Sequence, residues 1–445
     1  MTTLEKALLV LSIILAIGWG STIYYYTAIY RPKPTIITIT LETKAGLWAD
    51  FIREMKVIPK FEDKMWNERG ILVRVRMITA PHKGYADKVI ADFAAGVAGD
   101  VVWMKSDPLP DMVESGWLLD LTPYVQKWDE WNQFYPSMQE LGSYKGKVYA
   151  IWVETAPQVV YYRKDLFKAA GLPVPWQPKS WDDIIDAALA IKEKLPDVDV
   201  PLYAINPTLA AIGAGEKMYD PEDGKFIVKS EELLDAFKFF YDASIRYGVT
   251  PPAVKLEKWD TRKLFQDGEL AILVDGVWCW SEKWGPGMPY EIENREEVVG
   301  YAHFPGSGKP GAPQYASYTG GYGYMINAKT EHPDLAWELL KDLVAPEIAA
   351  EWNYPTSHLA CRKDAVIGKY AEDEFLKWAT TTLEYSSLLP RVEGFSTWKK
   401  IFDDVVKDYL LTQGTSPEDC MNIFAEKVKE ELGADRVKAL PPYSL

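Results

Sequence analysis

Strand-like and helix-like segments alternate in the first part of the chain, and this order constrains the fold more than any other sequence feature. Residues 35–41 are rich in β-branched side chains and predict a strand, and apolar residues recur at helical spacing over 47–62. A second strand is expected over 71–77, a second helix over 86–98 and a third strand over 101–104. This alternation predicts parallel β-α-β units and therefore an α/β domain.

The rest of the chain continues the mixed pattern and is too long for a single core. Ser180 and Asp183 form a capping-box pair that predicts the start of a helix, and Ser416 precedes a proline and two carboxylates that predict another. Residues 305–313 are rich in proline and glycine and form the clearest break in composition. A chain of 445 residues is expected to form two or three domains.

An uncharged, largely apolar segment stands near the N-terminus. It covers residues 7–30, 24 residues between Lys6 and Arg31, which exceeds the roughly 20 residues needed for a transmembrane helix. Tyrosines at its far end are typical of a membrane interface. The sequence predicts an uncleaved transmembrane anchor over 7–30 and a short spacer over 31–35, with a cleaved signal peptide or a buried hydrophobic helix as alternatives.

The composition excludes several functions. The 49 Lys and Arg against 64 Asp and Glu give a net charge of −15, which argues against binding to nucleic acid. The four histidines have no metal-ligand spacing, and the sequence contains neither a phosphate-binding GxxxxGK[ST] loop nor a GxSxG motif. We therefore expect no metal, no cofactor and no catalytic residues. The 18 tryptophans indicate either a large core or a flat ligand.

The three cysteines, Cys279, Cys361 and Cys420, are widely spaced and form no CxxC pair. They allow at most one disulfide within the chain, for which Cys361–Cys420 is conceivable, or they are three small buried apolar residues.

Seven groups of segments, in chain order, resemble one family. They are GDVVW (99–103) with MVESGWLLDLTP (112–123), YKGKVYAIWVE (144–154), YRKDLF (162–167), KSWDD (179–183), FQDGELA (265–271) with DGVW (275–278), GG (320–321) and EHPDLAW (331–337). Together they resemble the extracellular solute-binding proteins of ABC importers, in the carbohydrate-binding family that includes the maltose/maltodextrin-binding protein. The order of the segments agrees with that family from about residue 36 to residue 430.

The resemblance implies an α/β, two-lobed periplasmic-binding-protein-like fold with a hinge and a ligand cleft between the lobes, here preceded by one N-terminal transmembrane helix. Lobe 1 is expected over 36–153 plus 308–356, and lobe 2 over 154–307 plus 357–445. The second implied crossing between the lobes falls at the proline- and glycine-rich break.

The resemblance and the sequence pattern together give a set of expected ligand-binding residues. Aromatic rings stack on the apolar face of a sugar, and charged or small polar groups bind its hydroxyls. The expected set is Lys44, Trp48, Lys105, Asp107, Glu154, Trp278, Tyr318, Gly320, Gly321, Phe395 and Trp398. Each position also has a structural alternative: a place in the core for Trp48 and Trp278, a hinge or surface ion pair for Glu154, and a solvated loop charge for Asp107. Met104 departs from the pattern, because the maltodextrin binder carries a stacking tryptophan there.

The function expected from this resemblance is the substrate-binding component of an ABC transporter, tethered to the cell membrane through the N-terminal helix. Its binding domain would lie on the extracellular side, capture a sugar, preferably an oligosaccharide, and deliver it to the permease subunits. A surface sensor or adhesin without a transporter is one alternative, and two others remain at this point. One is a binder of glycerol phosphate, a polyamine or a peptide, and the other is a glycan-acting enzyme that uses Asp107, Glu154 and Asp275.

Overall fold

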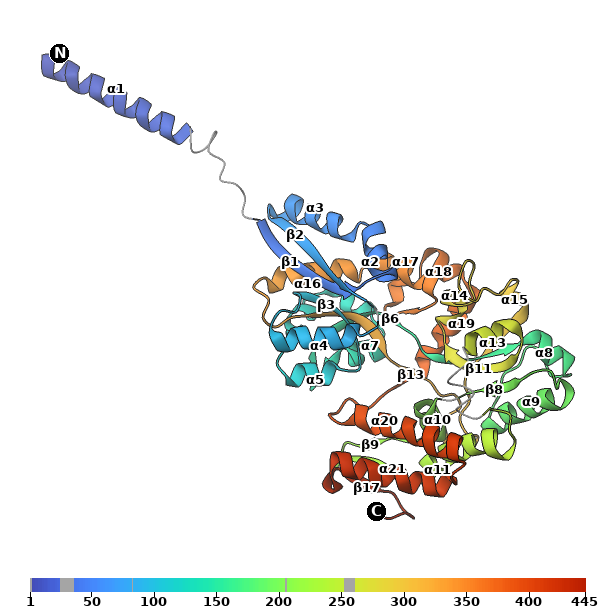
Figure 1. Ribbon diagram of the computed structural model, residues 1–445. Coiled ribbons are helices and arrows are strands. Elements are labelled where there is room, and N and C mark those ends of the chain that lie inside the picture. The colour runs from blue at the N-terminus through green and yellow to red at the C-terminus, as the bar shows by residue number, and fades with distance from the viewer. Residues whose placement is uncertain (1, 25–35, 82, 205, 252–260) are drawn as a thin grey trace.

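The computed structural model describes residues 2–24, 36–81, 83–204, 206–251 and 261–445. Figure 1 shows two α/β lobes that share no sheet. The expected two-lobed α/β fold is therefore confirmed.

The first lobe contains a six-stranded sheet. Its strands are β1 (Ile36–Lys44), β2 (Leu72–Ala80), β3 (Val101–Lys105), β6 (Ala150–Thr155), β14 (Gly321–Ile326) and β15 (Leu359–Ala360). They lie in the order β15-β6-β14-β3-β1-β2, where β2, β1 and β3 are parallel and β14 and β15 pair antiparallel with their neighbours. Because β3 is central in this sheet, the loop that follows it emerges at the middle of one sheet edge.

Helices flank this sheet. They are α2 (Leu47–Glu54), α3 (Val57–Arg69), α4 (Tyr85–Ala95), α5 (Leu109–Glu114), α6 (Thr122–Val125), α7 (Pro136–Leu141), α16 (Pro333–Leu343) and α17 (Pro346–Thr356). A short hairpin, β4 (Ser143–Tyr144) and β5 (Lys147–Val148), follows α7. The single helix expected over 47–62 is wrong, because Lys56 adopts a left-handed backbone with φ of 54° and separates α2 from α3.

The second lobe contains two smaller sheets. The four-stranded sheet has the order β12 (Val299–Ala302), β7 (Gln158–Arg163), β11 (Leu270–Gly276) and β8 (Val200–Tyr203). The three-stranded sheet has the order β17 (Val437–Ala439), β10 (Lys225–Lys229) and β9 (Tyr219–Asp220).

The second lobe and the linking region also contain most of the remaining helices. They are α8 (Lys164–Ala169), α9 (Trp181–Lys194), α10 (Pro207–Ala214), α11 (Glu231–Tyr241), α13 (Thr261–Asp267), α14 (Cys279–Glu282), α15 (Arg295–Val298), α18 (Gly368–Glu372), α19 (Glu374–Thr380), α20 (Phe395–Asp404) and α21 (Pro417–Leu432). The expected capping box is confirmed at α9, where Ser180 and Asp183 bond reciprocally to backbone N–H groups. The expected helix start at Ser416 is also confirmed, because Ser416 is the N-cap of α21 and its side chain accepts a hydrogen bond from the Asp419 N–H.

The chain passes between the two lobes at three places. It leaves the first sheet after β6, returns to it at β14, and leaves it for the last time after β15, which lies beside β6. Just before β14, the short strand β13 (Tyr318–Thr319) pairs in parallel with β16 (Ser387–Leu388). The exact lobe boundaries given from the sequence stay a prediction, but these crossings place β13 and β16 beside the junction of the lobes.

Helix α1 (Thr3–Tyr24) exposes its apolar side chains, including Trp19 at 71%. In the described part of the chain, no helix combines the length and hydropathy that a membrane span requires. The predicted transmembrane anchor over 7–30 is therefore not confirmed. Residues 25–30 and the spacer over 31–35 lie outside the described residues. The alternative of a buried hydrophobic helix also disagrees with this exposure.

Aromatic side chains make up much of both cores. The largest fully buried side chains include Trp48, Trp103, Trp152, Trp284 and Trp398. All three cysteines are buried and free, so Cys361 and Cys420 form no disulfide, and the interpretation of the cysteines as small core residues is confirmed.

Candidate functional site

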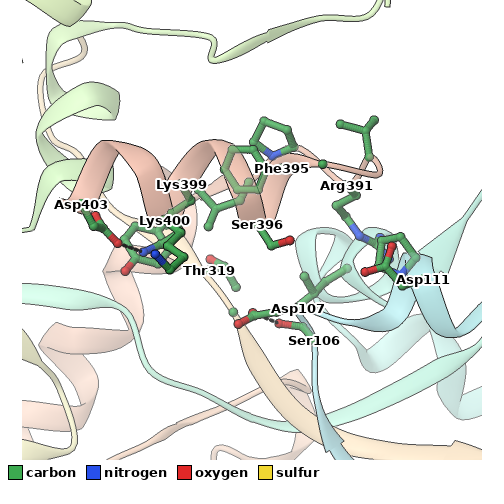
Figure 2. A pocket seen from close by; sticks show the side chains of 18 of the residues that line it. Ser106, Asp107, Asp111, Thr319, Arg391, Phe395, Ser396, Lys399, Lys400 and Asp403 are labelled. Atoms are coloured by element: carbon green, nitrogen blue, oxygen red, sulfur yellow. Dashed lines mark hydrogen bonds and ion pairs between the residues drawn. The ribbon is translucent and has the colours of Figure 1, made fainter. Parts of the chain in front are cut away.

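A cavity of about 560 Å³ lies between the lobes, at the junction marked by β13. Its walls come from the loop after β3 with α5 and α7, from β13, and from the segment that leads into α20. The lining residues are Ser106, Asp107, Pro110, Asp111, Leu141, Tyr318, Thr319, Gly320, Leu389, Pro390, Arg391, Val392, Gly394, Phe395, Ser396, Lys399, Lys400, Asp403 and Asp404. Figure 2 shows Phe395 and Ser396 of α20 on one side and Ser106 and Asp107 on the other. The volume of this cavity is typical of a small-molecule site.

The first-lobe wall is held by hydrogen bonds between β3 and β14. The Ser106 backbone N–H donates to the carbonyl of Gly321 at 2.9 Å, and the Gly321 N–H donates to Ser106 Oγ at 3.2 Å. These bonds fix the start of the loop after β3. The next side chain, Asp107, is 68% exposed and lies 3.3 Å from Lys105 Nζ. A carboxylate is thus presented to the cavity on a fixed support.

The junction wall consists of β13 and Gly320. Thr155 Oγ1, at the end of β6, donates to the Gly320 carbonyl at 2.6 Å, which ties this wall to the first sheet. Asn206 Nδ2 donates to Tyr318 Oη at 3.4 Å. Burial raises the pKa of Tyr318, so its hydroxyl remains protonated and can both donate and accept.

Helix α20 supplies the second-lobe wall. Its cavity side presents the ring of Phe395, the hydroxyl of Ser396, and two i,i+4 ion pairs, of which Lys399–Asp403 measures 2.6 Å. Burial opposes the charge of Lys399, but Asp403 outweighs this and the net pKa is raised. Burial also raises the pKa of Asp403, which Lys399 offsets in part. The helix therefore offers donors and acceptors beside one apolar ring.

Arg391 closes one end of the cavity. Its Nη1 donates to the backbone carbonyls of Glu140 and Ser143 in the first lobe, so this side chain crosses the junction. Burial lowers the pKa of Arg391 to about 10. The guanidinium is thus already bonded to protein and helps to fix the distance between the lobes.

This arrangement suits binding of a neutral polar molecule. The Lys105–Asp107 and Lys399–Asp403 pairs bring donors and acceptors without a large excess of either charge, and the Phe395 ring gives an apolar surface. Among the described residues, no group of three His, Cys, Asp or Glu side chains is placed to hold a metal ion.

Comparison with known families identifies the class of protein. The profile of the bacterial extracellular solute-binding protein family matches residues 22–350, more than half of the chain. The chain belongs to this family.

Individual solute-binding proteins align with this chain along most of their length. The maltodextrin-binding protein MdxE of Bacillus subtilis is 22% identical over 408 residues, which cover 89% of this chain and 91% of MdxE. The sugar-binding protein MalE from Xanthomonas citri has a TM-score of 0.76 and 21% identity, covering 90% of this chain and 98% of MalE. The GacH receptor of Streptomyces glaucescens, solved without ligand and with acarbose, has a TM-score of 0.72 and 18% identity, covering 90% and 100%. These structures share the fold of this chain.

Four of the expected ligand-binding residues of this solute-binding protein line the cavity: Asp107, Tyr318, Gly320 and Phe395. Gly321 lies next to them but within the sheet, where a Cβ atom would come within 2.9 Å of the Glu154 carbonyl oxygen. Strand packing therefore accounts for a glycine at this position.

The structure places two of the expected tryptophans in the cores. Trp48 is fully buried and donates from Nε1 to Tyr324 Oη at 2.8 Å, and its ring packs against Trp103. Trp398 is fully buried and donates to the Ile227 carbonyl at 2.9 Å. Neither ring has a face open to a ligand in this conformation, which agrees with the core alternative, and sugar stacking by these two rings stays a prediction.

Glu154 also lies below the surface. It is buried, accepts a hydrogen bond from Trp352 Nε1, and lies 4.0 Å from His358 Nε2. His358 also lies near a second carboxylate, because its Nδ1 is 3.8 Å from Glu282 Oε1. This position fits the hinge alternative better than a direct ligand contact.

Three further expected residues lie outside the lining of this cavity. Trp278 is half-buried between two cations, with Arg262 4.6 Å and Lys283 5.5 Å from its ring. Lys44 lies 5.0 Å above the ring of Tyr322, at the end of β1. Lys105 reaches the cavity only through its ion pair with Asp107.

The carboxylates proposed for the enzyme alternative are not brought together in this cavity. Asp107 lines it, Glu154 is buried under Trp352, and Asp275 is paired with Arg262 at 3.0 Å. The arrangement therefore gives no support to an acid and nucleophile pair made of these three groups.

Sequence reasoning missed Asp111 of the first-lobe wall and most of the second-lobe wall. The missed second-lobe residues include Arg391, Ser396, Lys399 and Asp403, which all line the cavity. The last three repeat at helical spacing on one face of α20, beside the aromatic residue that was expected. A polar stripe on a helix usually faces solvent, so only the position of the first lobe reveals its role.

Proposed function

We propose that this protein captures an oligosaccharide in the cavity between its lobes and delivers it to the permease of an ABC importer, on the extracytoplasmic side of the membrane. The observation that carries this proposal is the combination of paired charges, hydroxyls and one aromatic ring on two facing walls.

A sugar matches these walls chemically. Its hydroxyls bond well to carboxylate and ammonium groups, because hydrogen bonds to charged groups are stronger than neutral ones. Its C–H face packs on an aromatic ring such as Phe395. A strongly charged ligand would compete with ion pairs already formed on α20, which costs part of the binding energy.

The relatives support the same ligand class. MdxE of Bacillus subtilis is named for maltodextrin, and the GacH structures contain acarbose. Ligand contacts made by both lobes would favour a closed form, which is the form that a permease can distinguish from the empty one.

The proposal is tested by isothermal titration calorimetry of the purified chain. The panel contains glucose, mannose and arabinose oligomers, with glycerol phosphate and putrescine as the non-sugar solutes. We expect at least one oligosaccharide to bind saturably and neither of the two non-sugar solutes to bind. Binding of glycerol phosphate or putrescine alone, or no binding of any sugar by folded protein, would contradict the proposal.

A variant pair connects binding to the cavity. Phe395→Ala removes the apolar ring from the second-lobe wall and is expected to weaken sugar binding about tenfold or more. Trp66→Ala removes a ring that is 51% exposed on α3 and should leave binding unchanged. If both substitutions weakened sugar binding equally, the Phe395 ring would not be a specific contact and the sugar would not be assigned to this cavity.

A further inference from the structure

A second cavity of about 510 Å³ adjoins the first on the second lobe. It is bounded by the end of α10, the following turn, the loop before β13, and the chain around β16. Its lining residues are Ile212, Gly215, Glu216, Lys217, Met218, Tyr219, Gly311, Pro313, Tyr315, Tyr385, Ser387, Leu388, Leu389 and Pro390.

One segment lines both cavities in chain order. Ser387 and Leu388 of β16 line only the second cavity, Leu389 and Pro390 line both, and Arg391 lines only the first. The strand β16 is held in place by pairing with β13, which itself lines the first cavity. Because an extended chain advances about 3.3 Å per residue, the two cavities meet within a few residues along one continuous wall.

The second cavity has the chemical character of a sugar site. Tyr219, Tyr315 and Tyr385 are all half-buried, so each has part of its ring available. The Tyr315 and Tyr385 rings lie 5.4 Å apart at 49°, and Tyr385 Oη is bonded to His303 Nδ1 at 2.6 Å. Tyrosine supplies rigid contact area and a polar tip at low entropic cost.

The charged groups at this cavity are few. The Glu216 carboxylate is buried and already accepts from Ser230 Oγ and from the Met218 N–H. Lys217 is exposed beside it. The surface is therefore mainly aromatic and aliphatic with little charge, which favours a neutral group over an ion, and the tyrosine hydroxyls can bond to the hydroxyls of a sugar.

We propose that the second cavity is an additional subsite that binds further sugar units of an oligosaccharide held in the first cavity. This inference rests on the proposed function and adds to it a preference for longer chains. The shared residues Leu389 and Pro390 are the point over which the chain passes from one cavity to the other.

The test is affinity as a function of chain length. Calorimetry is performed with glucose, mannose and arabinose oligomers, each from the disaccharide to the heptasaccharide. In the series that binds, we expect the affinity to rise at least about tenfold between the shortest and longest chains. Affinity that is independent of length overturns the subsite and leaves the proposed function intact. Failure of every sugar to bind overturns the proposed function and the subsite together.

A blocking variant locates the gain. Ser387→Trp fills the second cavity from an exposed position and keeps the backbone bond from Ser387 N–H to the Ser317 carbonyl at 2.9 Å. We expect this variant to lose the increase in affinity with chain length. The matched control, Ser444→Trp, adds the same ring at an exposed position near the C-terminus and should keep that increase.

The outcome that would overturn the assignment is a Ser387→Trp protein, folded by circular dichroism, whose affinity still rises with length as in the unmodified chain. Ser396→Trp, in the first cavity, gives the opposite pattern if the assignment is correct, because it should weaken binding of chains of every length.

Discussion

Asp107 is a cavity residue whose role in binding can be separated from any role in stability. Its side chain is 68% exposed and its ion pair with Lys105 is of a kind that contributes roughly 0–1 kcal/mol. A hydrogen bond from a ligand hydroxyl to a carboxylate contributes about 1.5–3 kcal/mol. We expect Asp107→Asn to weaken oligosaccharide binding about ten- to hundredfold, measured by calorimetry, with an unchanged melting temperature.

Asp50 offers the matched control for this substitution. It is also an exposed, ion-paired aspartate of the first lobe, 2.6 Å from Arg53, but it does not line the cavity. Asp50→Asn should bind the ligand like the unmodified chain. A loss of affinity of similar size in both variants would show a general effect of charge rather than a contact made by Asp107.

Glu216 gives a prediction for the pH dependence of stability. Burial raises its pKa, an effect that the Ser230 hydroxyl and the Met218 N–H offset in part. The unfolded chain therefore loses this proton at lower pH than the folded chain, so the carboxyl lowers the free energy of unfolding as pH rises from its ordinary pKa of about 4.3 through the raised value. Glu216→Gln lacks this contribution.

Urea unfolding of both proteins from about pH 4 to about pH 8 measures the difference. We expect the stability of Glu216→Gln relative to the unmodified chain to increase with pH across that window. A constant difference between the two proteins would mean that the pKa of Glu216 is the same in the folded and unfolded states.

At the scale of elements, strand β14 joins the antiparallel part of the first sheet to its parallel part, and it depends on glycine. A Cβ atom on Gly323 would lie 2.2 Å from the Ile151 carbonyl oxygen of β6. We expect Gly323→Ala to lower the free energy of unfolding by about 3 kcal/mol or more, measured by urea denaturation. Gly320→Ala, three residues earlier in the chain, is the control, because its Cβ would meet only Ser106 Oγ at an ordinary 3.5 Å. Equal losses would show that strand packing is not the cause.

The starts of several elements could be predicted because their signals are local. Ser180 and Asp183 bond to backbone groups within the same helical turn, so the capping box is complete in the sequence itself. The break between α2 and α3 could not be predicted, because the apolar stripe runs through it and Lys56 carries no local signal for a left-handed backbone. Local chemistry decides caps, whereas packing decides such a break.

At the scale of the whole molecule, only part of the expected set lines the cavity, because the exposure of a ring depends on distant contacts. Trp48 fits both a helix core stripe and a ligand site, and its hydrogen bond to Tyr324, 276 residues away, decides for the core. Asp107 and Tyr318 could be predicted because they follow or form strands at the lobe junction. Lys399 and Asp403 could not, since their helix faces the cavity only after the second lobe packs beside the first.

The position of the cavity predicts a change of shape on binding. Asp107 belongs to the first lobe and Phe395 to the second, so a ligand that contacts both residues stabilises the conformations in which the two walls are close together. We expect small-angle X-ray scattering to show a smaller radius of gyration with saturating oligosaccharide. Ligand at about 100 times its Kd should also add about 2.7 kcal/mol to the free energy of unfolding. At the same ligand concentration, Asp107→Asn should show a smaller change in both measurements. Saturable binding with an unchanged radius of gyration would contradict this prediction. It would mean that the ligand contacts both walls without any movement of the lobes, because the cavity already has its bound shape.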